Sequence, residues 1–135
     1  WAREQFYSLC RQCGVSDLLV LTGDSHSFWA NQLTAEDGER MGLELGTAGI
    51  SSPGDFIEQG FDRVNAKRID EALAQHAPDI RWTSNLYQGY VRLILTPSEG
   101  RADYIAMSTV KSRQYSIDVI HRESINRNGS SLQFA

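Results

Sequence analysis

The sequence predicts a mixed α/β fold whose C-terminal half is a largely antiparallel sheet. Apolar residues recur with helical spacing over residues 2–13 and 62–77. Between them, residues 18–21 form a continuous apolar run of the length that a buried strand needs. From Ile80 onward, apolar and polar residues alternate in segments with short connections, which is typical of an antiparallel meander.

The composition is that of an ordinary soluble globular protein. The 135 residues, of which 41% are hydrophobic and 22% charged, suffice for one domain or part of one. The net charge of −4 argues against nucleic-acid binding, which usually requires a basic surface. No apolar run reaches membrane-spanning length, and no leader peptide is recognisable. Because the chain begins with Trp1 rather than Met, we expect a fragment or a processed chain.

Residues 2–13 form the first predicted helix, with Gly14 as its C-terminal stop. Four residues at helical spacing form its predicted buried face: Phe6, Leu9, Cys10 and Cys13. A Cys-x-x-Cys pair occurs in redox sites and in zinc sites, but the second half of a zinc site is missing here. We therefore interpret both cysteines as small buried hydrophobic residues.

A predicted strand at residues 17–22 leads directly into a candidate site. Gly23 ends the strand, and Asp24 and His26 follow immediately. The helix-then-strand order is that of the second half of a β-α-β unit, so we expect the first strand upstream of Trp1. In open α/β sheets, ligands lie just beyond the carboxyl ends of the strands. Asp24 and His26 are therefore candidate metal ligands.

In an extended segment, Asp24 and His26 point to the same face with backbones roughly 6.6 Å apart. Their side chains can then converge on one metal ion, or reach two metal ions about 3.5–4 Å apart. Two simpler interpretations stay open. A Gly-Asp pair after a strand is ordinary turn chemistry, and a lone histidine is often a hydrogen-bonding residue rather than a ligand.

Two further predicted strands and a glycine-rich loop follow this turn. Residues 28–32 alternate like a strand, residues 35–40 form a polar turn, and residues 41–46 are another predicted strand. Residues 46–54 are rich in small side chains but lack the lysine and the spacing of a phosphate-binding loop. Such a segment is either a flexible surface loop or a backbone that comes close to a ligand or to the Asp-x-His turn, and we expect the close packing.

The second predicted helix begins after Asp62 as its N-cap and runs to about Ala77, with Pro78 beyond it. Its predicted buried stripe is narrow and consists of Ala66, Ile69, Leu73 and Ala77. Charged residues form its predicted solvated face: Arg63, Lys67, Arg68, Asp70 and Glu71. His76, near the helix end, is expected at the surface rather than in a metal site.

The C-terminal half contains four predicted strands. They comprise residues 80–84, 91–95 and 102–109, with the last marked by Tyr115, Ile117 and Val119. Residues 96–100 are a strong turn signal. The tail from Glu123 is polar. It includes a glycosylation triplet at residues 128–130, which is too common by chance to carry weight.

Three segments carry a family resemblance: Leu21-Thr-Gly-Asp-Ser-His26-Ser-Phe-Trp-Ala-Asn31, Glu44-Leu-Gly-Thr-Ala-Gly-Ile-Ser-Ser52 and Gly89-Tyr-Val-Arg-Leu. In this order they resemble the C-terminal part of the alkaline phosphatase D (PhoD-like) family of metallophosphoesterases. The resemblance implies the C-terminal half of a calcineurin-like β-sandwich, in which helices flank two facing sheets. It also implies a phosphoester substrate and an exported or periplasmic parent protein.

The resemblance further implies a two-metal site that hydrolyses phosphomonoesters or phosphodiesters through a metal-activated water. Asp24 and His26 then match ligands from the last metal-binding loop of the family. Carboxylate and imidazole donors suit iron, manganese or zinc, with calcium at oxygen-rich positions.

The family's other ligand motifs, which lie on earlier strands, do not occur in this sequence. A catalytic site usually needs at least three protein ligands per metal. We therefore expect residues 1–135 to be a single unit from a larger metallophosphoesterase domain, inactive without the missing N-terminal part. The exposed strand edges of such a fragment favour homo-oligomers. The alternative is a non-catalytic binding or interaction domain that retains half of a phosphatase fold.

Overall fold

The computed structural model describes residues 1–15, 17–97, 99–128 and 131–135 and contains two four-stranded sheets. The first sheet has the order β1 (Leu18–Thr22), β3 (Arg40–Gly46), β2 (Phe28–Thr34) and β4 (Ile80–Ser84). The second has the order β5 (Gly89–Leu95), β6 (Gly100–Met107), β7 (Ile117–Asn128) and β8 (Ser131–Phe134).

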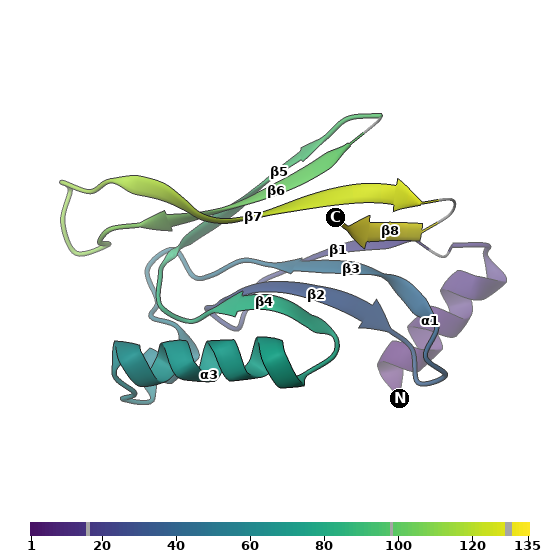
Figure 1. The fold of residues 1–135 in the computed structure, drawn as a ribbon, viewed down its shortest axis with the longest axis horizontal. Helices are drawn as coiled ribbons and strands as arrows, with labels where there is room; N and C mark the ends of the chain where they lie inside the picture. The colour runs from purple at the N-terminus through teal and green to yellow at the C-terminus, as the bar shows by residue number, and fades with distance from the viewer. Residues whose placement is uncertain (16, 98, 129–130) are drawn as a thin grey trace.

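The two sheets lie face to face, with helices on one side of the pair (Figure 1). Helices α1 (Ala2–Gln12) and α3 (Arg63–His76) cover the face of the first sheet that points away from the second. The short helix α2 (Asp55–Glu58) lies between β3 and α3 in the chain. Strands β1 and β3 pair in parallel, and the other neighbouring strands pair antiparallel. The predicted α/β fold with a largely antiparallel C-terminal half is confirmed.

The main core fills the space between the two sheets. Its fully buried members come from both sheets: Phe28, Ala30, Leu43, Leu45, Ala102, Tyr104 and Ile125. The Tyr104 hydroxyl donates a hydrogen bond to the carbonyl oxygen of Trp29 at 2.8 Å and so links the sheets through the core. Burial raises the pKa of Tyr104, which keeps this hydroxyl protonated as a donor. None of the described helices is long and apolar enough to cross a membrane.

Helix α1 forms where it was predicted, but its buried face differs from the prediction. The helix is followed by Gly14 at φ 70°, a left-handed conformation that favours glycine. Tyr7 and Cys10 are the buried residues, and they pack with Met41 in a second, smaller core. The helix is rotated to bury the large Tyr7 ring, so three residues of the predicted face are exposed: Phe6, Leu9 and Cys13.

Helix α3 confirms the predicted cap and part of the predicted stripe. The Asp62 carboxylate accepts a hydrogen bond from the Asn65 backbone N–H at 2.8 Å, and Ala66 is buried. His76 is exposed, as expected. The prediction that Asp70 lies on the solvated face is wrong, because Asp70 is only 5% exposed. It lies one turn after Ala66 on the same face and takes its hydrogen bonds from a loop outside the helix.

The C-terminal sheet is larger than the sequence indicated. Strand β7 continues to Asn128 and pairs with β8, so the segment from Glu123, described from the sequence only as a polar tail, forms a strand pair. A sheet with one solvated face needs polar residues at alternate positions, and the tail supplies them. The predicted turn at residues 96–100 is closed by a bond from the Thr96 N–H to the Glu99 carbonyl at 2.8 Å. Residue 98 of that turn, and residues 129 and 130 of the glycosylation triplet, lie outside the described residues.

Candidate metal site at the end of β1

The turn after β1 carries both predicted ligands, but it is tightly folded rather than extended. Asp24 has φ 74° and His26 has φ 53°. The Ser25 N–H donates to the Gly23 carbonyl at 3.0 Å, and the Trp29 indole donates to the Ser25 hydroxyl at 2.8 Å. The extended geometry expected from the sequence is therefore wrong, because left-handed residues reverse the chain. Such conformations cost about 1–3 kcal/mol each and are concentrated at functional sites.

His26 lies beside two carboxylates that the sequence did not single out. One potential ligand atom from each of His26, Asp55 and Glu58 lies within 4.8 Å of the other two. Asp55 and Glu58 are the first and last residues of α2, and Asp24 is exposed at the turn, outside this group. No sequence pattern indicated this grouping, since the two segments lie far apart in the chain. Asp24 stays a predicted ligand.

These residues fit a metal ion. His26 Nδ1 is buried, and no hydrogen-bond partner for it exists among the described residues. A buried polar atom without a partner costs about 1–3 kcal/mol, a cost that a bound ligand removes. One imidazole and two carboxylates are a donor set typical of transition-metal sites in proteins. His26 therefore has both the free nitrogen and the acidic neighbours that a metal ligand needs.

The glycine-rich loop packs against this turn, as predicted. A Cβ atom added to Gly49 would lie 3.5 Å from His26 Cδ2 and 3.2 Å from the Ser52 carbonyl oxygen. At Gly54, an added Cβ would lie 2.2 Å from the Asn85 carbonyl oxygen, so a side chain is excluded there. The small residues let this loop approach the turn closely and bring α2 next to His26.

Asn85 joins the segments that form the site. Its Oδ1 accepts a hydrogen bond from the Ser27 hydroxyl at 2.5 Å, and its Nδ2 and backbone N–H donate to the Asp70 carboxylate at 2.7 and 3.0 Å. All three residues are buried. Ser27 follows His26 directly, and Gly54 on the other side of Asn85 precedes α2. Asn85 therefore holds both halves of the candidate site, a role that no sequence pattern indicated.

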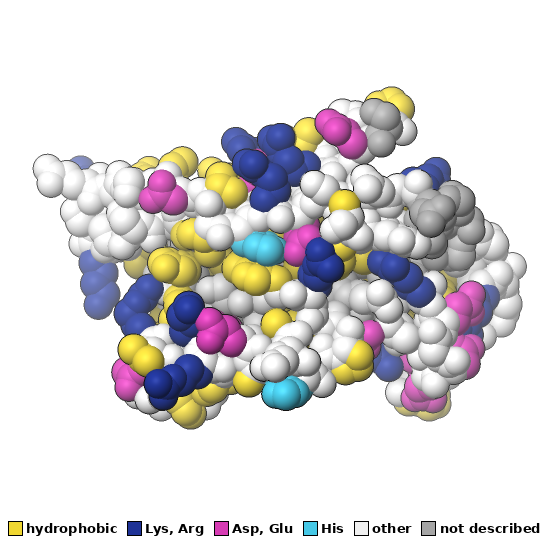
Figure 2. All heavy atoms as spheres, in the orientation of Figure 1, with side chains coloured by type: hydrophobic (Ala, Val, Ile, Leu, Met, Phe, Trp, Pro, Cys, Tyr) yellow, Lys and Arg dark blue, Asp and Glu magenta, His cyan; other side chains and the backbone are white. Residues whose placement is uncertain are grey.

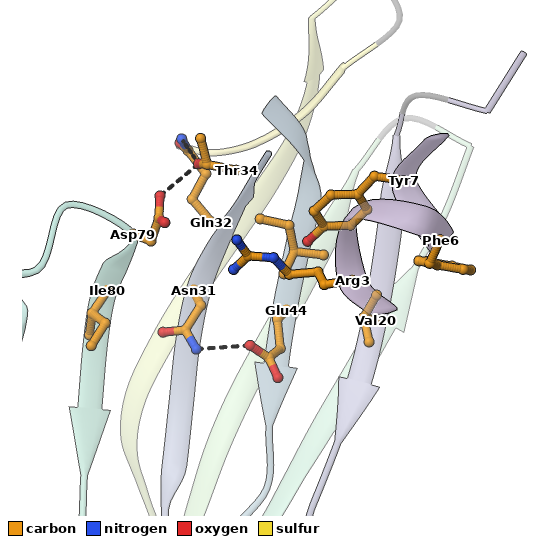
Figure 3. Close-up of a pocket in the computed structure, with 11 residues that line it drawn as sticks. Arg3, Phe6, Tyr7, Val20, Asn31, Gln32, Thr34, Glu44, Asp79 and Ile80 are labelled. Carbon is orange, nitrogen blue, oxygen red and sulfur yellow. Dashed lines mark hydrogen bonds between the residues drawn. The ribbon is translucent and has the colours of Figure 1, made fainter. Parts of the chain in front are cut away.

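A separate cavity of about 400 Å³, lined by both apolar and polar residues, lies between α1 and the first sheet (Figure 3). Its carboxylates are already paired: Asn31 donates to Glu44 at 2.9 Å, and Thr34 donates to Asp79 at 2.6 Å. No histidine lines it. The cavity therefore lacks the free nitrogen that distinguishes the His26 site.

The comparisons with known proteins identify the family. The family model described as PhoD-like phosphatase matches residues 1–104. The chain belongs to the PhoD-like phosphatase family. Within this family, alkaline phosphatase D of Bacillus subtilis (strain 168) is 29% identical over 108 residues, which cover 80% of this chain and 18% of that protein.

A solved structure described as the structure of PhoD shares the fold. It aligns with a TM-score of 0.68 at 20% identity, over 98% of this chain and 24% of that one. The similarity of fold includes the C-terminal strands, beyond the residues matched by the family model. This PhoD-like chain thus spans less than a quarter of the length of both relatives.

Proposed function

We propose that this chain forms part of a metal-dependent phosphoesterase that hydrolyses phosphomonoesters or phosphodiesters. The observation that carries the proposal is the PhoD-like phosphatase match over residues 1–104, which includes the turn with Asp24 and His26. The similarity to alkaline phosphatase D supports the same class of reaction.

In this proposal, His26 contributes a ring nitrogen to the metal site. Asp24 lies two residues before it in the chain, and a carboxylate oxygen of each of the α2 residues Asp55 and Glu58 lies within 4.8 Å of its ligand atom. Such mixed donors suit iron, manganese or zinc, and oxygen-rich positions suit calcium. A metal ion bound there supplies an activated water and stabilises the negative charge that develops on phosphate oxygens.

The chain's own contribution is to fix its donors before an ion binds. The backbone at Gly49 packs against the His26 ring, and Asn85 ties the turn to the loop that precedes α2. A donor set held by packing and hydrogen bonds needs little rearrangement on binding, which favours both affinity and correct placement of the reacting water.

We propose that the remaining ligands come from another part of a longer protein with a calcineurin-like arrangement. A two-metal site needs more donors than this chain brings together, and the chain covers only 18% and 24% of its two relatives. The 135-residue chain alone is then inactive. The competing hypothesis is a non-catalytic binding domain, which the following experiment separates.

The test replaces the two predicted ligands in the protein that carries this chain. We expect Asp24→Asn and His26→Ala to lower hydrolysis of aryl phosphate monoesters and diesters by about a hundredfold or more, because a lost ligand weakens the metal and misplaces the water. Metal content should fall in parallel while the circular dichroism spectrum is retained. His76→Ala, at an exposed helix end, is the matched control and should retain activity and metal.

Unchanged activity and metal content in both ligand variants would reduce the Asp-x-His turn to a structural feature. A wild-type protein that neither hydrolyses these esters nor retains metal would support the binding-domain hypothesis instead.

A further inference from the structure

The outer face of the second sheet carries three arginines around one buried carboxylate. Asp103 has no exposed surface. Arg122 Nε donates to its Oδ1 at 2.6 Å, and Arg92 Nη2 donates to its Oδ2 at 2.7 Å. Arg101 Nε lies 3.2 Å from Oδ1. Figure 2 shows a compact group of basic side chains over the middle of this sheet.

Strand pairing places these side chains together. Arg92 on β5 is directly opposite Asp103 on β6, and Asp103 is directly opposite Arg122 on β7. Arg101 precedes Asp103 by two residues, which puts both on the same face of the strand. The arrangement is therefore fixed by the register of three strands rather than by mobile loops.

The three arginines, hereafter the arginine patch, carry more charge than Asp103 neutralises. Asp103 is the one carboxylate with which they form ion pairs among the described residues, so two positive charges remain. The three side chains are between 43% and 52% exposed. The chain as a whole has a net charge of −4, so this positive surface has the opposite sign to the protein's overall charge.

We propose that the arginine patch binds a phosphate group with two negative charges, from a soluble phosphate compound or from a phospholipid headgroup. Asp103 uses only Nε of Arg122 and only Nε and Nη2 of Arg92, which leaves other guanidinium N–H groups for a ligand. A planar guanidinium matches phosphate oxygens in pairs, and two remaining charges match a phosphate dianion. The patch lies on the sheet face, not at the loops around His26, and it does not rest on the proposed function.

The experiment titrates the protein that carries this chain with inorganic phosphate and with tripolyphosphate in a calorimeter at low salt. His26→Ala serves as the background, so that the candidate metal site does not contribute. We expect Arg92→Gln/Arg122→Gln to weaken binding at least tenfold. The matched control, Arg68→Gln/Arg113→Gln, removes the same charge at two exposed arginines and should change binding less than twofold.

A third variant separates a shaped site from simple charge. Arg92→Lys/Arg122→Lys keeps the charge but loses the paired donors of guanidinium, so we expect at least threefold weaker binding. If the glutamine pair does not fold, the lysine pair alone decides the question, by its threefold threshold. The proposal is overturned if neither the soluble probes nor phosphatidic acid vesicles bind, if the lysine pair binds like wild type, or if both glutamine pairs weaken binding equally. The arginines would then only pair with the buried Asp103 carboxylate and would not bind a ligand.

Vesicle sedimentation distinguishes the two sources of phosphate. Binding to phosphatidic acid vesicles, but not to phosphatidylcholine vesicles, that disappears in Arg92→Gln/Arg122→Gln identifies a lipid headgroup. Binding of the soluble probes without vesicle binding identifies a soluble phosphate compound. Either result supports the arginine patch as a phosphate site.

Discussion

Asp70 and Asp103 are both buried carboxylates, but the regions around them use them in opposite ways. Asp70 lies behind the candidate site and takes its hydrogen bonds from the neutral amide and backbone of Asn85. Asp103 lies on the second sheet beneath three guanidinium groups. Burial raises the pKa of Asp70, whereas hydrogen bonds from Arg122 and Arg92 lower the pKa of Asp103 to about 2.

The difference shows what each carboxylate contributes. Asp70 links α3 to Asn85, and through Asn85 to the turn and to the loop before α2, so its burial secures geometry across distant segments. Asp103 links only neighbouring strands that already pair through their backbones. Substitutions near Asp70 should therefore disturb the candidate site, and substitutions at Asp103 should change stability and surface charge.

The largest expected effect is at Asn85. Asn85→Asp places a second carboxylate against Asp70, where the Nδ2 atom now donates at 2.7 Å. Two buried like charges without a cation should lower the free energy of unfolding by about 3–5 kcal/mol at pH 7. The loss should be smaller at pH 4, where one of the two carboxyl groups binds a proton. Denaturant unfolding at both pH values measures it.

Asn126→Asp is the matched control, because it introduces the same charge on an exposed residue of β7. It should change the free energy of unfolding by no more than about 0.5 kcal/mol. Equal losses in the two variants would mean that the Asn85 network does not hold the loops.

A smaller effect follows from the opposite pKa shifts. Asp103→Asn should cost about 1–2 kcal/mol at pH 7, a modest value because the paired arginines are half exposed. The folded pKa of about 2 lies below the reference value of 3.8, so the stabilisation is complete above pH 3.8 and disappears as the pH falls toward 2. The cost of the substitution should shrink over this interval in urea titrations. Asp118→Asn, exposed on β7, should show no such slope.

Asp70→Asn should give the opposite slope in the same titrations. Its raised pKa means that ionised Asp70 costs stability, and this cost appears as the pH rises above 3.8 through the folded pKa. At every pH, Asp70→Asn lacks one of the carboxylate oxygens that accept hydrogen bonds from Asn85. At high pH it also lacks the buried negative charge that destabilises the wild-type protein. Its disadvantage relative to wild type should therefore be larger at low pH than at neutral pH. Parallel slopes for Asp70→Asn and Asp103→Asn would contradict the contrast between the two regions.

The same contrast explains what the sequence could and could not predict. Periodicity located α1, α3 and the first strands, because apolar residues recur at the spacing of a helix or form the short run of a buried strand. It named the wrong buried face of α1, where Tyr7 is buried and Phe6 is exposed. It failed at Asp70, whose burial depends on Asn85, and at Glu58, which meets His26 only through the glycine-rich loop. Polar residues in β7 and β8 hid a strand pair for a related reason, since a solvated sheet face looks like a loop in composition.

The candidate site was predictable only in part. The Asp-x-His turn is a local motif with a recognisable position after a strand, so Asp24 and His26 could be named from the sequence. The residues that hold and complete the site are brought together by folding. No local pattern reports that Ser27, Asn85 and Asp70 form one network, or that α2 lies beside the turn.

The last prediction compares the strained turn with a regular strand. Asp24 has φ 74°, a conformation that glycine adopts freely and β-branched residues resist, whereas Asp118 lies within strand β7. In metal-free protein, Asp24→Gly should leave the free energy of unfolding within about 0.5 kcal/mol of wild type, and Asp24→Val should lower it by about 1–2 kcal/mol. At Asp118 the order should reverse, with Val more stable than Gly by about 1 kcal/mol, because strands favour β-branched residues. Thermal unfolding of the four variants measures both differences. If Val is tolerated equally well at both positions, the turn relaxes without cost, and the left-handed backbone at Asp24 is not imposed by the surrounding loops.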